Sequence, residues 1–566
     1  MLPDGDERGA VVKLICVARE ATRATESVLR DATAAVRERV GGTAHTVERL
    51  FEREQRATHG LAWLATYVES IRQITAYAER MHRAAELGAL EELLIRIGLG
   101  EYLAQIAGGI PMSQGEFARP ADFGLVPAAV VQHIAGPLED LVVRSDERRR
   151  LVELMRGADH VPVGEHGLDE TLAAIRDETR KFAESEVKPQ AHAWHLSNST
   201  IPLGIVEQMA ALGLFGLTIP ATYKGGLGLG REAMCVVAEE LSRSYIGVGS
   251  LVTRSEIAAE LILTSGTEEQ KRKWLPAIAA GKVLPTAVFT EPDAGSDLAS
   301  LKTRALRQGD VYRVYGNKTW ITHAARADLM ILLARTNPKD MSHRGLSMLL
   351  AEKPRGTDDI PFPAKGMSGS EIEVLGYRGM KEYEIAFDGF EVPASSLLGG
   401  LEGLGFKQLM ATFESSRVQT AARAIGVAQA AMEEAHRYAQ TRQQFGQPIV
   451  NFPRVADKIA MMAAEIMMAR QLTYFAAWQK DAGRRCDMEA AMAKLLAARV
   501  AWAAADNAVQ IHGGNGFALE FPVSRLLCDA RIFSIFEGSA EIQAQIIARG
   551  LLDGSHGQGG KATTIP

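Results

Sequence analysis

The stretch SIFEGSAEIQ, from Ser534 to Gln543, places one carboxylate, Glu537, between an aromatic residue and a glycine. A carboxylate on a solvated helix face would need no explanation. One wedged between Phe536 and Gly538, with apolar residues upstream, is placed to take a proton from a substrate. Glu537 is therefore the first candidate for a catalytic group.

The loop FTEPDAGSD, from Phe289 to Asp297, follows the strand-like run LPTAVF. It offers backbone N–H groups and the hydroxyls of Thr290 and Ser296, which suit a ligand that carries carbonyls and phosphates. An ordinary β-turn is the alternative for this loop taken alone.

The segment KTWIT, from Lys318 to Thr322, reads as a strand with Trp320 and Thr322 on one face. An aromatic plane beside a hydroxyl would cover a planar heterocycle. A core tryptophan beside a satisfied threonine is the commoner alternative.

Two further stretches are candidates for ligand contacts. In TRQQFGQPI, the residues Arg442, Gln444 and Phe445 combine a fixed charge, an amide and a ring, as a pyrophosphate with an attached ring requires. A surface ion pair is the alternative for Arg442. In QIHGGNGF, closely spaced glycines permit close approach of a ligand to the backbone. No intact GxGxxG or GxxxxGK[ST] occurs there, so neither a Rossmann nor a P-loop site is indicated.

Composition indicates a globular protein that is confined to the cytoplasm. The chain has 566 residues, 47% of them hydrophobic, and a net charge of −6, which gives no reason to expect nucleic acid as a partner. Its four cysteines form no CxxC pair, and its first residues lack the build of a signal peptide. No apolar run approaches a membrane span. His192 and His195 have no obvious third ligand, so no metal site is expected.

Hydrophobic periodicity predicts an α+β fold that is mostly helical and is built from successive domains. The parts are a helical extension (1–162), a helical domain (163–284), a β domain (285–400), a helical domain with a four-helix bundle (401–552) and a flexible tail (553–566). Within the extension, apolar residues from Leu61 to Met81 at three- and four-residue steps predict a helix with one apolar face. The segment His160–Gly167 reads as a linker.

Together and in this order, FTEPDAGSD, KTWIT, RQQFG, QIHGGNGF and FEGSAEIQ make the region from Leu168 to Leu552 resemble the acyl-CoA dehydrogenase family. The resemblance implies FAD and oxidation of an acyl-CoA thioester between its α and β carbons. Glu537 would remove the α proton while the β hydrogen leaves as hydride to flavin N5. Burial should raise the pKa of Glu537. A tyrosine often stands where this chain has Phe536, which puts local hydrogen bonding in doubt.

The resemblance also assigns ligand contacts residue by residue. Those to FAD are Phe289, Thr290, Ser296, Trp320, Thr322, Ser539 and Glu541, with Arg442, Gln444, Phe445, Gln510, Gly513 and Gly514 reaching the FAD of a neighbouring subunit. Ser296 would also meet the CoA arm, and Glu414 and Arg417 would grip its pantetheine part. An i,i+3 helix pair is the alternative for Glu414 and Arg417.

Within the family, the chain most resembles members with a similarly long extension, and this resemblance implies (2S)-methylsuccinyl-CoA as the substrate and mesaconyl-CoA as the product. Such a substrate needs a cation for its carboxylate, and Arg254 in VTRSE is the favoured clamp. Arg378 is the alternative clamp, and a salt bridge of Arg254 with Glu256 or Glu260 is the structural alternative. Glutaryl-CoA and short branched-chain acyl-CoA remain rival substrates.

Electron-transferring flavoprotein is the implied electron acceptor, and a homodimer is favoured over a tetramer because the extension would block a second assembly step. An oxidase that uses O₂ and a non-catalytic flavin scaffold remain as less favoured functions.

Overall fold

The computed structural model describes residues 5–41, 44–156 and 164–553, which fall into two compact units. Unit 1 comprises residues 1–173 and 420–566, and unit 2 comprises residues 174–419. The helices α7 (Glu170–Phe182) and α13 (Gly405–Thr441) contain the boundaries between the units. The N-terminal extension therefore shares a unit with the C-terminal helices.

Unit 1 is almost entirely helical among its described residues. From the extension it takes α1 (Gly5–Val40), α2 (Ala44–Arg53), α3 (Gln55–Ala84), α4 (Ala89–Gly108), α5 (Pro127–Asp140) and α6 (Ser145–Leu154). From the C-terminal part it takes α14 (Pro453–Asp481), α15 (Asp487–His512), α16 (Pro522–Arg531) and α17 (Ala540–Leu552). Two short hairpins, β1 (Ile110–Pro111) with β2 (Phe117–Ala118) and β10 (Gln443–Gln444) with β11 (Gln447–Pro448), complete it.

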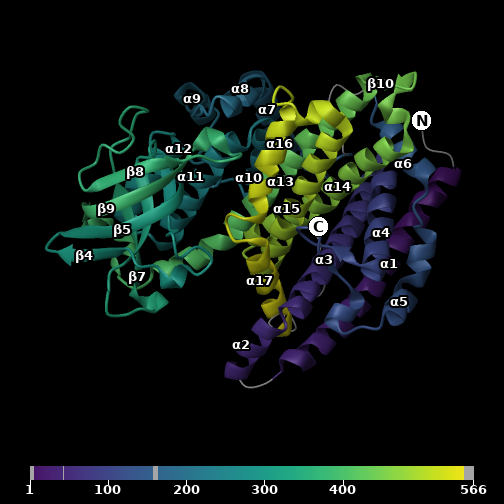
Figure 1. Cartoon of the computed structure of the whole chain (residues 1–566), viewed down its shortest axis with the longest axis horizontal. Helices are drawn as coiled ribbons and strands as arrows, with labels where there is room; N and C mark the ends of the chain where they lie inside the picture. The colour runs from purple at the N-terminus through teal and green to yellow at the C-terminus, as the bar shows by residue number, and fades with distance from the viewer. Residues whose placement is uncertain (1–4, 42–43, 157–163, 554–566) are drawn as a thin grey trace. The chain divides into compact units, whose positions relative to one another are not determined.

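The helix α3 is the centre of unit 1. It packs against α1, α4, α14, α15 and α17, so segments from both ends of the sequence surround it (Figure 1). The predicted apolar face is buried, as Leu61 and Ile71 show, but burial extends beyond it to Thr66 and Gln73. Neighbours on all sides of α3 require small, apolar or internally bonded residues around its whole circumference.

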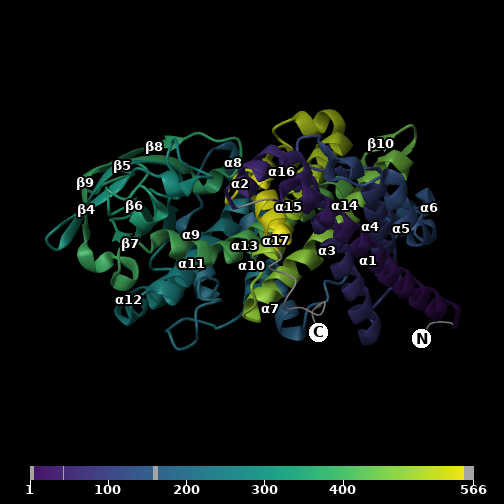
Figure 2. The same ribbon diagram turned by 90° about the horizontal axis from the view of Figure 1, so that it is seen from below.

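Unit 2 joins helices to a β-sheet (Figure 2). Its helices are α8 (Lys188–Leu196), α9 (Leu203–Ala211), α10 (Arg231–Ser244), α11 (Ile246–Ser265) and α12 (Glu268–Ala279). Its strands are β3 (Pro285–Val288), β4 (Arg304–Gln308), β5 (Val311–Thr322), β6 (Leu329–Arg335), β7 (Leu346–Glu352), β8 (Met367–Ile372) and β9 (Glu382–Pro393). The sheet order is β3-β6-β4-β5-β9-β8, with β7 paired to β6. The change of period beyond Lys282 thus marks a β domain, as predicted.

The strand β6 shows why its sequence, LMILLAR, is apolar without alternation. Leu329 and Ile331 join the core formed with α11 and α12, whereas Met330 and Leu332 join a second core on the other face. A strand covered on both faces reads as a continuous apolar run.

Two predicted boundary features fall near the undescribed residues. Of the expected linker His160–Gly167, residues 160–163 lie outside the described residues, and so do residues 554–566 of the expected tail. The rest of the linker is packed in unit 1: Tyr77 donates a 2.6 Å hydrogen bond to the carbonyl of Glu165, and Gln471 donates to that of His166. No helix among the described residues has the length and apolar character that crossing a membrane requires.

Candidate active site

Glu537 lies in a tight turn between α16 and α17, held in a conformation that few glutamates adopt. Its φ is +52°, and Gly538 follows at +87°. A left-handed non-glycine residue costs about 1 kcal/mol or more and persists where its surroundings fix it. Here the buried Lys494 and Gln543 both donate hydrogen bonds to the carbonyl of Gly538, the latter at 3.0 Å. The turn therefore presents the Glu537 carboxylate at a fixed place.

Two residues of α13 hold that carboxylate. Arg423 Nη2 lies 2.8 Å from Glu537 Oε1, and Thr420 Oγ1 donates to Glu537 Oε2 at 2.5 Å. The Arg423 side chain is 0% exposed and that of Glu537 is 15% exposed. The guanidinium also lies 5.1 Å from the ring centre of Phe536. The ion pair favours the ionised carboxylate, the form that accepts a proton, and so opposes the effect of burial on which the sequence prediction rested.

In unit 2 the structure brings together the loop FTEPDAGSD and the segment KTWIT. The N–H of Thr319 donates to the carbonyl of Thr290 at 3.0 Å, and Lys318 Nζ donates to the carbonyl of Phe289 at 2.8 Å. Lys318 also forms a 3.0 Å ion pair with Glu291. Phe289 and Thr290 are consequently fixed beside β5.

The Lys318–Glu291 pair is buried and shifts both groups. Burial lowers the pKa of Lys318 to about 8, although Glu291 opposes the shift. Burial alone would raise the pKa of Glu291, but Lys318 and the N–H groups of Lys302 and Thr303 hold it below its ordinary value. Both groups stay charged at neutral pH, with their hydrogen bonds met inside the protein.

Trp320 and Thr322 differ sharply in exposure despite their spacing. The pairing of β5 with β9 shifts register between Lys318 and Ile321, and Trp320 has φ of +58°. This irregularity leaves Trp320 56% exposed, whereas Thr322 is buried. An exposed indole plane beside a buried hydroxyl is what a planar ring system needs as a cover.

Arg254 of α11 reaches the same strand. Its Nη2 donates to Thr322 Oγ1 at 2.9 Å, and that hydroxyl donates to the buried Glu382 at 2.8 Å. Glu256 and Glu260, the expected alternative partners, form ion pairs with Arg231 at 3.5 and 3.2 Å. Arg254 thus lies beside Thr322, a predicted flavin contact. The sequence alone did not predict this proximity.

In unit 1 the stretches RQQFG and QIHGGNGF lie next to each other. Tyr438, one helical turn before Arg442, stacks on His512 at 4.1 Å between ring centres and accepts a 3.1 Å hydrogen bond from Asn515. Phe445 at the tip of the β10–β11 hairpin is 92% exposed. Side chains added at Gly513 or Gly514 would meet open space, so a ligand has room there.

The remaining predicted residues take simpler positions. Ser539 directly precedes α17 and Glu541 lies in its first turn, where a carboxylate is favoured by the helix dipole. Ser296 and Gln510 are exposed. Glu414 and Arg417 lie on the unit 2 part of α13, with Arg417 5.6 Å from the ring centre of Phe413.

Sequence reasoning missed the residues that hold these groups in place. They are Thr420, Arg423 and Lys494 around the base, Lys318 and Glu291 between the two flavin-type stretches, Glu382 beside Thr322, and Tyr438 beside His512. One signal was available: Arg423 is the one charged residue in the run TAARAIGVAQAA, and a charged side chain on such a mostly apolar helix needs a buried partner.

These surfaces fit FAD. An exposed indole with a neighbouring hydroxyl suits the isoalloxazine ring, and an exposed hairpin with an arginine beside open glycines suits the dinucleotide half. The described residues contain no group of three or more His, Cys, Asp or Glu placed to hold a metal ion.

Comparison with known proteins agrees with this organisation. Residues 169–282, 286–390 and 403–552 match in turn the N-terminal, middle and C-terminal domains of acyl-CoA dehydrogenases. The chain belongs to the acyl-CoA dehydrogenase family, and it is an FAD-dependent enzyme.

Particular relatives refine the comparison. The chain is 59% identical over 544 residues to (2S)-methylsuccinyl-CoA dehydrogenase of Cereibacter sphaeroides, a match that covers 95% of this chain and 98% of that protein. The solved structure of butyryl-CoA dehydrogenase from Megasphaera elsdenii is 31% identical, with a TM-score of 0.64, and covers 68% of this chain and 99% of that one. A glutaryl-CoA dehydrogenase in complex with glutaryl-CoA is 35% identical, also with a TM-score of 0.64, and covers 68% of this chain and 96% of that one.

Proposed function

We propose that the enzyme oxidises (2S)-methylsuccinyl-CoA to mesaconyl-CoA, with Glu537 as the base that removes the α proton. The observation that carries this proposal is the 59% identity to the Cereibacter enzyme across 95% of the chain, which includes the N-terminal extension. The structures of butyryl- and glutaryl-CoA dehydrogenases cover only 68% of the chain.

The residues around Glu537 support its role as the base. The α proton of a thioester is weakly acidic, so the base must be ionised, close and correctly oriented. Arg423 forms an ion pair with one carboxylate oxygen, and Thr420 donates a hydrogen bond to the other. FAD, when bound, supplies the acceptor for the β hydrogen as hydride. The predicted contacts in FTEPDAGSD, KTWIT, RQQFG, QIHGGNGF and the first turn of α17 would hold it.

Arg254 is the proposed clamp for the substrate carboxylate. Its hydrogen bond to Thr322 places the guanidinium beside a residue proposed to cover the flavin, where the reacting carbons must also lie. Arg378 is less suited, because two of its nitrogens, Nε and Nη1, already donate to the carbonyls of Val374 and His195. Glu414 and Arg417 would bind the CoA arm, together with Ser296.

Assembly and electron transfer complete the proposal. The exposure of Phe445 and Gln510 supports a homodimer in which each subunit completes the FAD site of the other. Electron-transferring flavoprotein is the proposed acceptor. We also propose the domain boundaries 163–284, 285–400 and 401–552 for the dehydrogenase part.

The test is anaerobic bleaching of the bound flavin by methylsuccinyl-, succinyl-, glutaryl-, isobutyryl- and butyryl-CoA. Rapid bleaching by methylsuccinyl-CoA and its loss in Glu537→Gln, with FAD still bound, are expected. Preferential bleaching by butyryl- or isobutyryl-CoA would overturn the proposed substrate.

A variant of Arg254 tests the clamp. Arg254→Ala should lower kcat/KM for methylsuccinyl-CoA by about 10²- to 10⁴-fold, because a dicarboxylyl group would lose its charged partner. Arg272→Ala, at an exposed position of α12, is the matched control and should leave it unchanged. Wild-type kcat/KM in Arg254→Ala would show that another cation binds the carboxylate.

A further inference from the structure

The N-terminal extension contacts the base of the hairpin that bears Arg442, Gln444 and Phe445. We propose that α6 of the extension is a positioning element for FAD, which holds this hairpin in its binding conformation. The inference rests on the proposed function, since it takes the hairpin as an FAD contact.

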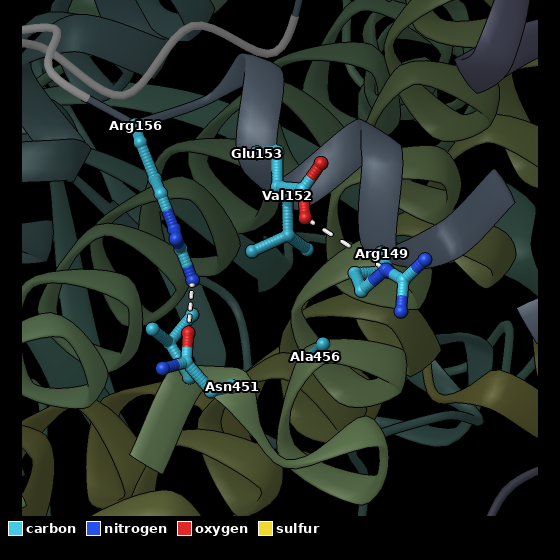
Figure 3. Close-up of a pocket in the computed structure, with 7 residues that line it drawn as sticks. Arg149, Val152, Glu153, Arg156, Asn451 and Ala456 are labelled. Carbon is cyan, nitrogen blue, oxygen red and sulfur yellow. Dashed lines mark hydrogen bonds and ion pairs between the residues drawn. The ribbon is translucent and has the colours of Figure 1, made fainter. Parts of the chain in front are cut away.

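A short relay of hydrogen bonds leads from the extension into the hairpin. Arg156, two residues beyond α6, donates through Nη2 to Asn451 Oδ1 at 2.8 Å (Figure 3). Asn451 in turn donates through Nδ2 to Gln447 Oε1 at 3.4 Å. Gln447 pairs with Gln444 across the hairpin. The guanidinium of Arg156 is thus two hydrogen bonds away from the strand that pairs with the proposed FAD contact.

An apolar contact lies beneath this relay. Val152 of α6, Val450 and Ala456 are all buried, and together they line a pocket of about 240 Å³ between α6 and the chain that follows the hairpin. Figure 3 shows Arg156 and Asn451 meeting at its edge, with Arg149 turned instead toward Glu153. The relay therefore lies beside the region where α6 packs against α14.

The other flank of the hairpin meets the same helix. The backbone of Val152 faces His436, six residues before Arg442 on α13, and burial with nearby Arg156 lowers the pKa of this histidine to about 4. The N–H of Ile449 donates to the carbonyl of Arg442 at 2.9 Å and closes the hairpin. The end of α6 consequently contacts the chain on both sides of the hairpin.

The position of α6 is itself fixed by the extension. Glu147 accepts a 3.1 Å hydrogen bond from Arg96 of α4, and it also caps the N-terminus of α6. Arg148 bonds Glu101 of α4 and lies 3.8 Å from Asp457 of α14. A two-stranded hairpin is marginally stable alone, so its shape depends on such anchors at its base. Holding it in place before FAD binds lowers the entropy lost on binding.

A double-mutant cycle tests the relay. The FAD dissociation constant of the apoprotein, measured by flavin fluorescence, should rise about three- to tenfold in Arg156→Gln and in Asn451→Ala. The double variant should bind FAD no more weakly than either single variant, because both remove the same contact. Arg149→Gln, the same charge change seven residues earlier on α6, should stay within about twofold of the wild type.

The outcomes separate this inference from the proposed function. Unchanged FAD affinity in Arg156→Gln, or additive losses in the double variant, would overturn the role of α6 and leave the dehydrogenase assignment intact. Weak binding in Asn451→Ala alone would also overturn it, since Asn451 would then meet FAD directly. Thermal unfolding of each apoprotein within about 2 °C of the wild type excludes a general loss of folding as the cause.

Discussion

Replacing Arg423 by methionine should move the acid limb of the pH–rate profile. The substitution keeps an unbranched chain of similar length in a fully buried position but removes the guanidinium that faces Glu537 at 2.8 Å. Loss of a hydrogen bond to a charged group is worth about 1.5–3 kcal/mol. Since one pH unit corresponds to 1.36 kcal/mol, the acid limb of kcat/KM should shift upward by about one to two units.

The measurement is kcat/KM for the acyl-CoA substrate from pH 5 to pH 9, with FAD content determined for every sample. The limb reports protonation of the free enzyme, in which the ion pair exists. At high pH the variant should recover most of its activity, apart from any loss caused by a less rigid carboxylate. Arg423→Lys keeps the charge, so its acid limb should move upward less than that of Arg423→Met.

A matched control uses the same helix. Arg437 of α13 is exposed and pairs with Glu434 at 2.6 Å, so Arg437→Met makes the same chemical change far from the turn of Glu537. It should leave the profile unchanged. A folded, FAD-loaded Arg423→Met enzyme with a wild-type acid limb would refute the reasoning, because Arg423 would then have no influence on the charge of the base.

Two further predictions follow from buried ionisable groups. Lys318→Met should lower the free energy of unfolding by about 3–5 kcal/mol, because Glu291 would remain buried without its cation, whereas the double replacement with Glu291→Leu should recover part of the loss in denaturant titrations. Burial lowers the pKa of His323 to about 3 and that of His436 to about 4. Both histidines are neutral in the folded protein, whereas in the unfolded chain they bind protons below about pH 6.5. As the pH falls from 7 to 5, each histidine should therefore lower the free energy of unfolding by about 2 kcal/mol. His436→Gln should shrink the measured drop by that amount, and an equal drop in the variant would contradict the linkage.

The order of helical and β domains could be predicted from sequence because each kind of domain has its own local pattern of apolar residues. The apolar strand β6 and the change of period beyond Lys282 are of this kind. The burial of α3 on every side could not be predicted in this way, since such a helix looks amphipathic when only its largest apolar residues are considered.

The site residues could be predicted because they lie in short sequence motifs, but the residues that hold them in place could not. Glu537 could be singled out because a carboxylate between Phe536 and Gly538 is chemically odd. Arg423 and Lys494 reach the same turn from helices that lie 114 and 44 residues away in sequence, and no local pattern encodes such pairings. The partnership of Lys318 with Glu291 likewise arises only when the two stretches meet at β5.

The division of unit 1 between the two ends of the chain has a consequence for biosynthesis. The first part of unit 1 is separated in sequence from its second part by the roughly 250 residues of unit 2. At about 5–20 residues per second, the ribosome takes roughly 10–50 s to supply them. During that interval α3 has been made, but α14, α15 and α17, which cover much of its surface, have not. The newly made N-terminal helices must therefore wait with apolar surface exposed, where binding by a chaperone would protect them from aggregation.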